Sequence, residues 1–114
     1  MKIVMKVNEI LQLNQLRMVN EKGSLDNEIS GIFTCDLLSH VMGHAKEGNA
    51  LITVLNNINV LGVASLLDLS CVIFTHDTEV NEDIITKANE LEIPLFVTDK
   101  TTYEITIYLY NLGI

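Results

Sequence analysis

The sequence has few cationic residues, and this scarcity limits the partners that it can bind. Seven lysines and arginines face 15 aspartates and glutamates, which gives the 114-residue chain a formal net charge of -8. Proteins that hold nucleic acid through its phosphates need a basic surface. Four of the seven cations lie within the first 22 residues, so no basic stripe extends over the rest. We therefore expect no nucleic-acid partner.

Long hydrophobic segments and closely spaced cysteines are also missing. No stretch approaches the roughly 18 uninterrupted apolar residues of a membrane span, and the start MKIVMKVNEILQLN lacks the apolar core and cleavage site of a signal peptide. We expect a cytoplasmic protein with no membrane partner. Cys35 and Cys71 stand 36 positions apart without a CxxC spacing, which favours buried free thiols over a disulfide.

The six glycines form neither of the two common phosphate-binding motifs. GxxxxGK[ST] and GxGxxG are both absent from the chain. An independent kinase or dehydrogenase is therefore disfavoured. We expect a protein that is not an enzyme and that uses no cofactor.

Short apolar runs alternate with segments of helical period from about residue 48, which is the pattern of βαβ units. The predicted strands are 50–55 (ALITVL), 71–75 (CVIFT) and 94–98 (PLFVT), and the predicted helices after them are 58–68, 81–92 and 101–112. Hydrophobic residues make up 48% of the chain, enough for a folded core. Strands this uniformly apolar are covered on both faces.

The first half of the chain adds two helices and two strands to this prediction. A helix over 36–47 would begin at Asp36 as N-cap and bury its apolar positions, which are Leu37, Leu38, Val41, Met42 and Ala45. Asn8 would cap a first helix, and Thr101 with Glu104 forms a capping-box pattern for the last one. Residues 16–35 are interpreted as a strand, a loop over 21–27 and a strand over 28–35. The predicted fold is a single doubly wound α/β domain over 1–114, with a mostly parallel sheet of about five strands and helices on both faces.

Polar residues follow the predicted strands, where such a sheet places its ligands and its helix N-termini. The predicted ligand-binding residues are Asn56, Asn57, Asn59, Thr75, His76, Thr98, Lys100, Thr101 and Thr102. Asparagine side chains can bind an amide, a base or a hydroxyl, although they supply no general base near neutral pH. The alternative is that the same residues serve only as turn and cap residues.

Two other patterns would bring different chemistry. His40 and His44 are four residues apart and Glu47 follows them, a spacing that metal-binding histidines on a helix can have. Because the HExxH motif is absent, we favour solvated or interface histidines and predict no metal site. Cys35, His76 and Asp77 would be needed for a nucleophilic site, and no nucleophile-elbow motif supports one.

Residues 28 to 112 resemble the DRTGG domain in the order of their sequence pieces. The matching pieces are Asp36, Leu38, Ser39, Val41 and Met42, then 50–53, then Ile93, Pro94, Leu95, Thr98 and Thr102. Some relatives carry a Gly-Asp-Arg type of loop where this chain has residues 56–59, and Gly-Gly where it has His76 and Asp77. The chain is similar to stand-alone members and to the N-terminal domain of HPr serine kinase/phosphorylase, without the catalytic P-loop domain.

The resemblance implies a doubly wound fold, homodimers and a regulatory role beside catalytic domains such as phosphotransacetylase or CBS-containing pyrophosphatase, with nucleotide effectors. Our leading hypothesis is a dimeric, non-catalytic regulatory domain that binds a small effector, for example an adenine nucleotide, at loops 56–59 and 98–102. Tyr103, Tyr108 and Tyr110 fit either a dimer interface or a helix that covers the sheet. The alternatives are an adaptor that modulates a partner kinase or metabolic enzyme, and a small cysteine- or metal-dependent enzyme.

Overall fold

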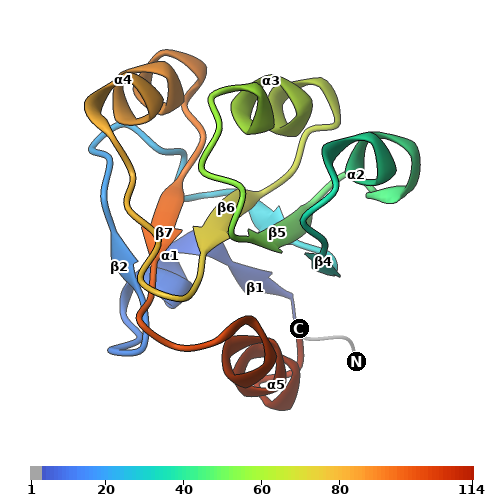
Figure 1. Cartoon of the computed structure of the whole chain (residues 1–114). Coiled ribbons are helices and arrows are strands. Elements are labelled where there is room, and N and C mark those ends of the chain that lie inside the picture. Colours follow the sequence, from blue (N-terminus) through green and yellow to red (C-terminus); the bar gives the residue numbers. More distant parts are fainter. Residues whose placement is uncertain (1–3) are drawn as a thin grey trace.

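A computed structural model describes residues 4–114, and its centre is a five-stranded sheet in the order β2-β7-β6-β5-β4 (Figure 1). The strands of this sheet are β2 (Arg17–Met18), β4 (Gly31–Thr34), β5 (Asn49–Thr53), β6 (Cys71–Phe74) and β7 (Leu95–Val97). The last four are parallel, and β2 runs antiparallel to β7. A mostly parallel sheet of five strands is therefore confirmed.

Helices cover both faces of this sheet, as predicted. The elements α2 (Leu38–His44), α3 (Asn59–Leu66) and α4 (Glu82–Leu91) lie on one face, and α1 (Val7–Leu11) and α5 (Thr102–Asn111) lie on the other (Figure 1). A small second sheet pairs β1 (Met5–Lys6) with β3 (Glu28–Ile29). From β4 to β7 the strand order follows the chain without reversal, because the three crossover helices share one face.

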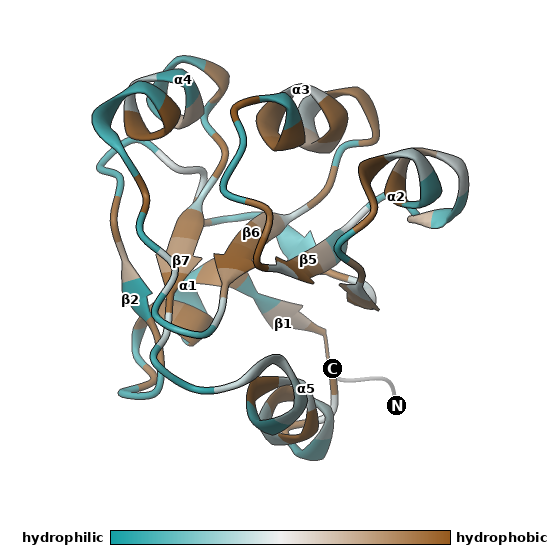
Figure 2. Cartoon of the chain, in the orientation of Figure 1, coloured by the Kyte–Doolittle hydropathy of each residue, from teal (hydrophilic) through white to brown (hydrophobic). Residues whose placement is uncertain are grey.

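The core forms because alternate strand residues point to opposite faces. Leu51 of β5 and Phe74 of β6 pack under α2, α3 and α4, whereas Ile52 and Ile73 pack toward α1 and α5. All four side chains are buried, and Figure 2 shows the hydrophobic colour along the central strands. Burying side chains of this size contributes about 1.5–3 kcal/mol each to the free energy of unfolding.

The helix predicted over 36–47 is shorter than expected. It spans Leu38–His44, and the prediction that Asp36 caps it is wrong. The Asp36 carboxylate instead accepts hydrogen bonds from the Thr53 hydroxyl and the Val54 backbone N–H, both at 2.9 Å. Two of the apolar positions predicted to be buried, Leu37 and Met42, are exposed. Asp36 therefore ties the end of β4 to the end of β5.

Two other local predictions also need correction. Asn8 lies inside α1, which begins one residue earlier, so it is not the cap. The strand predicted over 28–35 divides into β3 and β4 because the backbone turns at Gly31, whose φ of +148° favours glycine. The capping box at α5 is confirmed, since the Thr101 hydroxyl accepts from the Glu104 N–H and the Glu104 carboxylate from the Thr101 N–H.

Both cysteines are free thiols, as the sequence indicated. Cys71 is fully buried in β6, whereas Cys35 is only partly buried at the end of β4. Within residues 4–114, none of the helices is long and apolar enough to pass through a lipid bilayer.

Candidate functional site

The carboxyl ends of β4, β5, β6 and β7 meet at one edge of the sheet, because these strands are parallel and in register. We call this the carboxyl edge. The loops that leave it are 35–37 after β4, 54–58 after β5, 75–81 after β6 and 98–101 after β7. All of the predicted ligand-binding residues lie in these loops or in the first turn of the helix that follows.

The turn after β6 has an unusual backbone. His76 and Asp77 have φ values of 58° and 54°, which are in the left-handed region. A residue with a side chain is strained there by roughly 1–3 kcal/mol and needs support from its surroundings. The N–H groups of His76 and Asp77 donate to the carbonyls of Lys100 (2.8 Å) and Thr98 (2.9 Å). The His76 Nε2 accepts from the Thr102 N–H at 3.1 Å, so the β6 turn is fixed to the β7–α5 loop.

The threonines of the predicted site are held by hydrogen bonds within the protein. The hydroxyls of Thr75 and Thr102 lie 2.6 Å apart, and the Thr98 hydroxyl donates to the Gln15 carbonyl at 2.8 Å. Thr75 and Thr98 are buried, and Thr101 caps α5. These side chains shape the carboxyl edge, and their main contacts are structural.

The asparagines follow the same pattern but remain exposed. Asn56 Nδ2 donates to the Glu79 carbonyl at 2.9 Å, which joins the β5 loop to the β6 loop. Asn57 Oδ1 accepts from the Asn59 N–H at 2.8 Å, at the start of α3. The structure therefore brings Thr75, His76 and Thr102 together through hydrogen bonds. Asn57 and Asn59 instead share a hydrogen bond with each other.

Two adjoining cavities open at the side of this edge, beside β2. The first has a volume of about 630 Å³ and is lined by Arg17, Met18, Val19, Asp77, Thr78, Glu79, Val80, Ile85 and Val97. The second has about 240 Å³ and is lined by Asn14, Gln15, Leu16, Arg17, Asp77, Val97, Thr98 and Asp99. We call the two together the β2 groove, since Arg17, Asp77 and Val97 belong to both. Of the residues predicted to bind a ligand, only Thr98 lines it.

The side chains at the mouth of the β2 groove are free of other partners in the described part of the chain. No hydrogen bond or ion pair among residues 4–114 uses the Arg17 guanidinium or the carboxylates of Asp77 and Glu79. The ion pairs found there join Lys87 to Glu90 and Lys100 to Asp99. Sequence reasoning missed this groove, although Arg17 is the only arginine in the chain.

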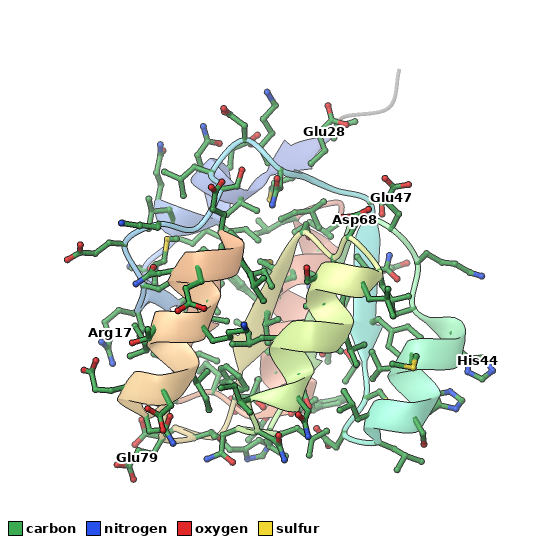
Figure 3. All side chains as sticks on the ribbon, turned by 90° about the horizontal axis from the view of Figure 1, so that it is seen from above. Arg17, Glu28, His44, Glu47, Asp68 and Glu79 are labelled. Atoms are coloured by element: carbon green, nitrogen blue, oxygen red, sulfur yellow. The ribbon has the colours of Figure 1, made fainter. Side chains whose placement is uncertain are left out.

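A third cavity, of about 700 Å³, lies at the opposite end of the strands. It is lined by four carboxylates, those of Asp26, Glu28, Glu47 and Asp68, together with Asn27, Ser30, Gly48, Leu69 and Ser70. Figure 3 shows Glu28, Glu47 and Asp68 gathered at this end, whereas Arg17 and Glu79 lie on the other flank. No buried polar side-chain atom in residues 4–114 lacks a hydrogen-bond partner, so nothing besides the carboxylates marks this cavity as a ligand site.

The two alternative chemistries find little support in this geometry. The rings of His40 and His44 stack at 4.0 Å between centroids, and the His44 Nδ1 lies 3.0 Å from the His40 carbonyl. Residues 4–114 contain no group of three or more His, Cys, Asp or Glu placed to hold a metal ion. Cys35 follows β4 and His76 follows β6, with β5 between them, so the structure does not bring these two together.

Comparisons with known proteins agree with this architecture. One similar solved structure is the crystal structure of the CBS and DRTGG domains of the regulatory region of Clostridium perfringens pyrophosphatase, complexed with its activator, diadenosine tetraphosphate. It matches this chain with a TM-score of 0.71 and 14% identity. The match covers 89% of this chain and 44% of that one, so this chain spans less than half the length of that regulatory region. No curated protein matches the sequence. The family model of the DRTGG domain matches residues 9–111, and this chain therefore belongs to the DRTGG domain family.

Proposed function

We propose that this chain is a non-catalytic regulatory domain that binds a small effector, for example an adenine nucleotide, at the carboxyl edge of its sheet. The observation that carries the proposal is the β2 groove, a cavity of about 630 Å³ with an adjoining one of about 240 Å³ at that edge. Small-molecule sites in proteins are commonly about 300–1,000 Å³ and largely pre-formed. The nucleotide class is taken from the activator bound by the similar pyrophosphatase region.

The hydrogen bonds of Thr75, Thr98 and His76 favour a binding role over a catalytic one at these three residues. Thr75 and Thr98 are buried and bonded within the protein, and His76 Nε2 is occupied by the Thr102 N–H. A general base needs a free nitrogen or carboxylate within reach of its substrate. Lys100 is the lysine among the predicted residues, and its side chain is 43% exposed and can reach an anionic ligand.

We also propose that the domain forms homodimers. The helix α5 exposes Tyr103 (75%), Tyr110 (72%) and Ile107 (41%) next to β4, which is an edge strand. Aromatic side chains are enriched in subunit interfaces, and an unpaired strand edge is open to a second chain. The expected oligomer is measurable by light scattering after size exclusion, and Tyr110→Glu should shift it toward monomer.

A second candidate function is a protein-interaction adaptor that modulates a kinase or metabolic enzyme. The observation that favours it is an apolar cavity of about 470 Å³ between α2 and α3, lined by Leu38, Met42, Ile58, Asn59, Gly62, Val63 and Lys87. Met42 and Ile58 are about half exposed there. An adaptor would bind its partner without any small molecule, which separates it from the effector hypothesis.

The test of the effector hypothesis is calorimetric titration of the full chain with adenine nucleotides. We expect saturable binding and a thermal stabilisation that grows with ligand concentration. Lys100→Gln should weaken binding of a phosphorylated ligand, because Lys100 lies at the carboxyl edge. Lys87→Gln is the matched control, since Lys87 is equally exposed at 45% and also lies near a carboxylate, but on α4. Absence of any nucleotide binding would refute the nucleotide hypothesis and favour the adaptor.

A further inference from the structure

We propose that the outer face of α2 and α3 is a self-association surface, on which the same face of a second copy of this chain packs around a two-fold axis. We call it the α2–α3 face and define it by five residues that are exposed or partly exposed, namely Leu38, Met42, Ile58, Gly62 and Leu66. The inference goes beyond the proposed function, because the homodimer proposed above uses α5 and β4, and α5 lies on the opposite face of the sheet (Figure 1).

The helix α3 lacks the charged outer side that a surface helix normally has. None of its residues is charged, and its exposed positions are Asn59, Gly62, Ser65 and Leu66. The neighbouring helix α4 shows the usual pattern, since acidic and basic residues occupy its exposed side. A helix without a polar face is normally buried, so we expect a partner to cover the outer side of α3.

The apolar residues of the α2–α3 face form two rows between which another helix can pack. On α3, Ile58, Gly62 and Leu66 follow one another at intervals of four residues, and Ile58 is 45% and Leu66 70% exposed. On α2, Leu38 and Met42 form the second row, and a cavity of about 470 Å³ is lined by residues of both rows. Side chains at intervals of four form the ridges that interdigitate between packed helices. Gly62 leaves a notch in its row, because a Cβ there would meet nothing within 4 Å.

The distribution of charge identifies a second copy as the occupant. The chain has a net charge of -8, yet Lys46 and Glu47 are the only charged residues between Leu37 and Leu67. Both follow α2 and lie outside the α2–α3 face. Like charges that face each other across an interface oppose association, so two copies of so acidic a chain approach most easily where carboxylates are absent. The α2–α3 face meets this condition on both copies at once, as a two-fold interface requires.

The charges that border the face favour an antiparallel arrangement of the two α3 helices. Glu47 and Asp68 lie beyond the C-terminal ends of α2 and α3 (Figure 3). Lys87 of α4 lines the cavity together with Ile58 and Asn59, which are at the N-terminal end of α3. An antiparallel pair separates the carboxylates of the two copies and turns Lys87 toward Asp68 of the partner subunit, which is an attractive arrangement.

The experiment measures the mass of the full chain by light scattering after size exclusion, at increasing protein concentration. Leu66→Glu puts a carboxylate on the α2–α3 face of both copies and should weaken self-association by at least about tenfold, so that the mass at a given concentration falls. Because Leu66 is 70% exposed, we expect this variant to fold, which circular dichroism checks. Leu25→Glu is the matched control, since Leu25 is an exposed leucine in the loop before β3, and it should leave the mass unchanged.

A second variant tests where the two-fold axis lies. Gly62→Cys adds a thiol at the centre of the α3 row, where the single chain has room for it. Two cysteines can be bridged when their Cα atoms lie within about 7 Å of each other, so this variant should form a disulfide between two chains when it is oxidised with diamide. The original chain, which keeps Cys35, is the control for cross-links through that residue.

Tyr110→Glu, measured alongside, separates this inference from the homodimer proposed at α5. If Leu66→Glu keeps the mass of the original chain, or if Gly62→Cys forms no cross-link between chains, the inference is overturned. A mass that falls with Tyr110→Glu alone then leaves the proposed homodimer standing. A chain that is monomeric at every concentration overturns both and leaves the α2–α3 face to an apolar helix of another protein. Neither result bears on effector binding.

Discussion

Asn20 links the chain segment after β2 to the start of the neighbouring strand β7. Its side chain is 5% exposed, its Nδ2 donates to the Ile93 carbonyl at 2.8 Å, and its Oδ1 accepts from the Leu95 N–H at 2.9 Å. The amide therefore fills the place of a neighbouring strand at the start of β7. Because it also positions the chain beside Val19, it supports one wall of the β2 groove.

Asn20→Ala should destabilise the protein strongly, because it leaves two backbone groups without partners in the interior. Each unsatisfied buried group costs about 1–3 kcal/mol, so for the two groups we expect a loss of roughly 2–6 kcal/mol. A domain of this size has a free energy of unfolding of about 5–15 kcal/mol. With a urea dependence of about 1–3 kcal/mol/M, the midpoint should fall by about 1 M or more.

The assay is urea unfolding of the Asn20→Ala variant followed by far-ultraviolet circular dichroism. Asn14→Ala is the control, since Asn14 is exposed and its side chain accepts only from the neighbouring Gln15 at 3.5 Å. We expect the control to change the free energy of unfolding by less than about 0.5 kcal/mol. A loss for Asn20→Ala within that same margin would refute the two-bond argument.

Three further outcomes follow from the structure. Gly62→Ala should stabilise α3 by about 0.5–1 kcal/mol, because the added Cβ meets nothing within 4 Å. Gly48→Ala should destabilise the protein by more than about 1 kcal/mol, because φ is +84° and the Cβ would lie 2.6 Å from Ser30 Oγ. Denaturant titration measures both changes. Burial raises the pKa of Cys71 to about 12 from 9.0, so its thiol should resist alkylation in the native protein, and stability should fall as the pH rises above 9.0. The hydrogen bond from the Thr101 N–H lowers the pKa of Glu104 below 4.5. The contribution of the Glu104 carboxylate to stability is therefore present above pH 4.5 and is lost as the pH falls through the lowered pKa. Glu104→Gln should remove this pH dependence of stability in acid titrations.

The central strands could be predicted from the sequence because their apolar runs are continuous and end at polar residues. The runs 50–55, 71–75 and 94–98 contain most of β5, β6 and β7, with boundaries that differ by one or two residues. A short apolar run bounded by polar residues is typical of a strand buried on both faces. Of the two helices between these strands, α4 has a side-chain cap at Asn81, whereas α3 has Ile58 at its N-cap and no side-chain cap. The parallel sheet then follows from the alternation of strands and helices, without knowledge of any tertiary contact.

The local patterns failed where a distant contact decided the outcome. Asp36 is a good cap by type, but its carboxylate bonds to Thr53 and Val54, 17 and 18 residues away. The β2 groove depends on the pairing of β2 with β7, which places Arg17 opposite Val97 although the two residues are far apart in the sequence. Propensity and spacing describe neighbours along the chain, so neither could place Arg17 beside Asp77.

The turn at His76 and Asp77 places two side chains where glycine would be unstrained. Both residues have a positive φ, of 58° and 54°, which glycine adopts without a steric cost. The two side chains are therefore held there at a cost in strain. His76 offsets part of it through the Thr102 N–H, but the Asp77 carboxylate bonds to nothing in the described chain. Asp77 lines both cavities of the β2 groove, and the proposed function would assign its free carboxylate to the bound effector.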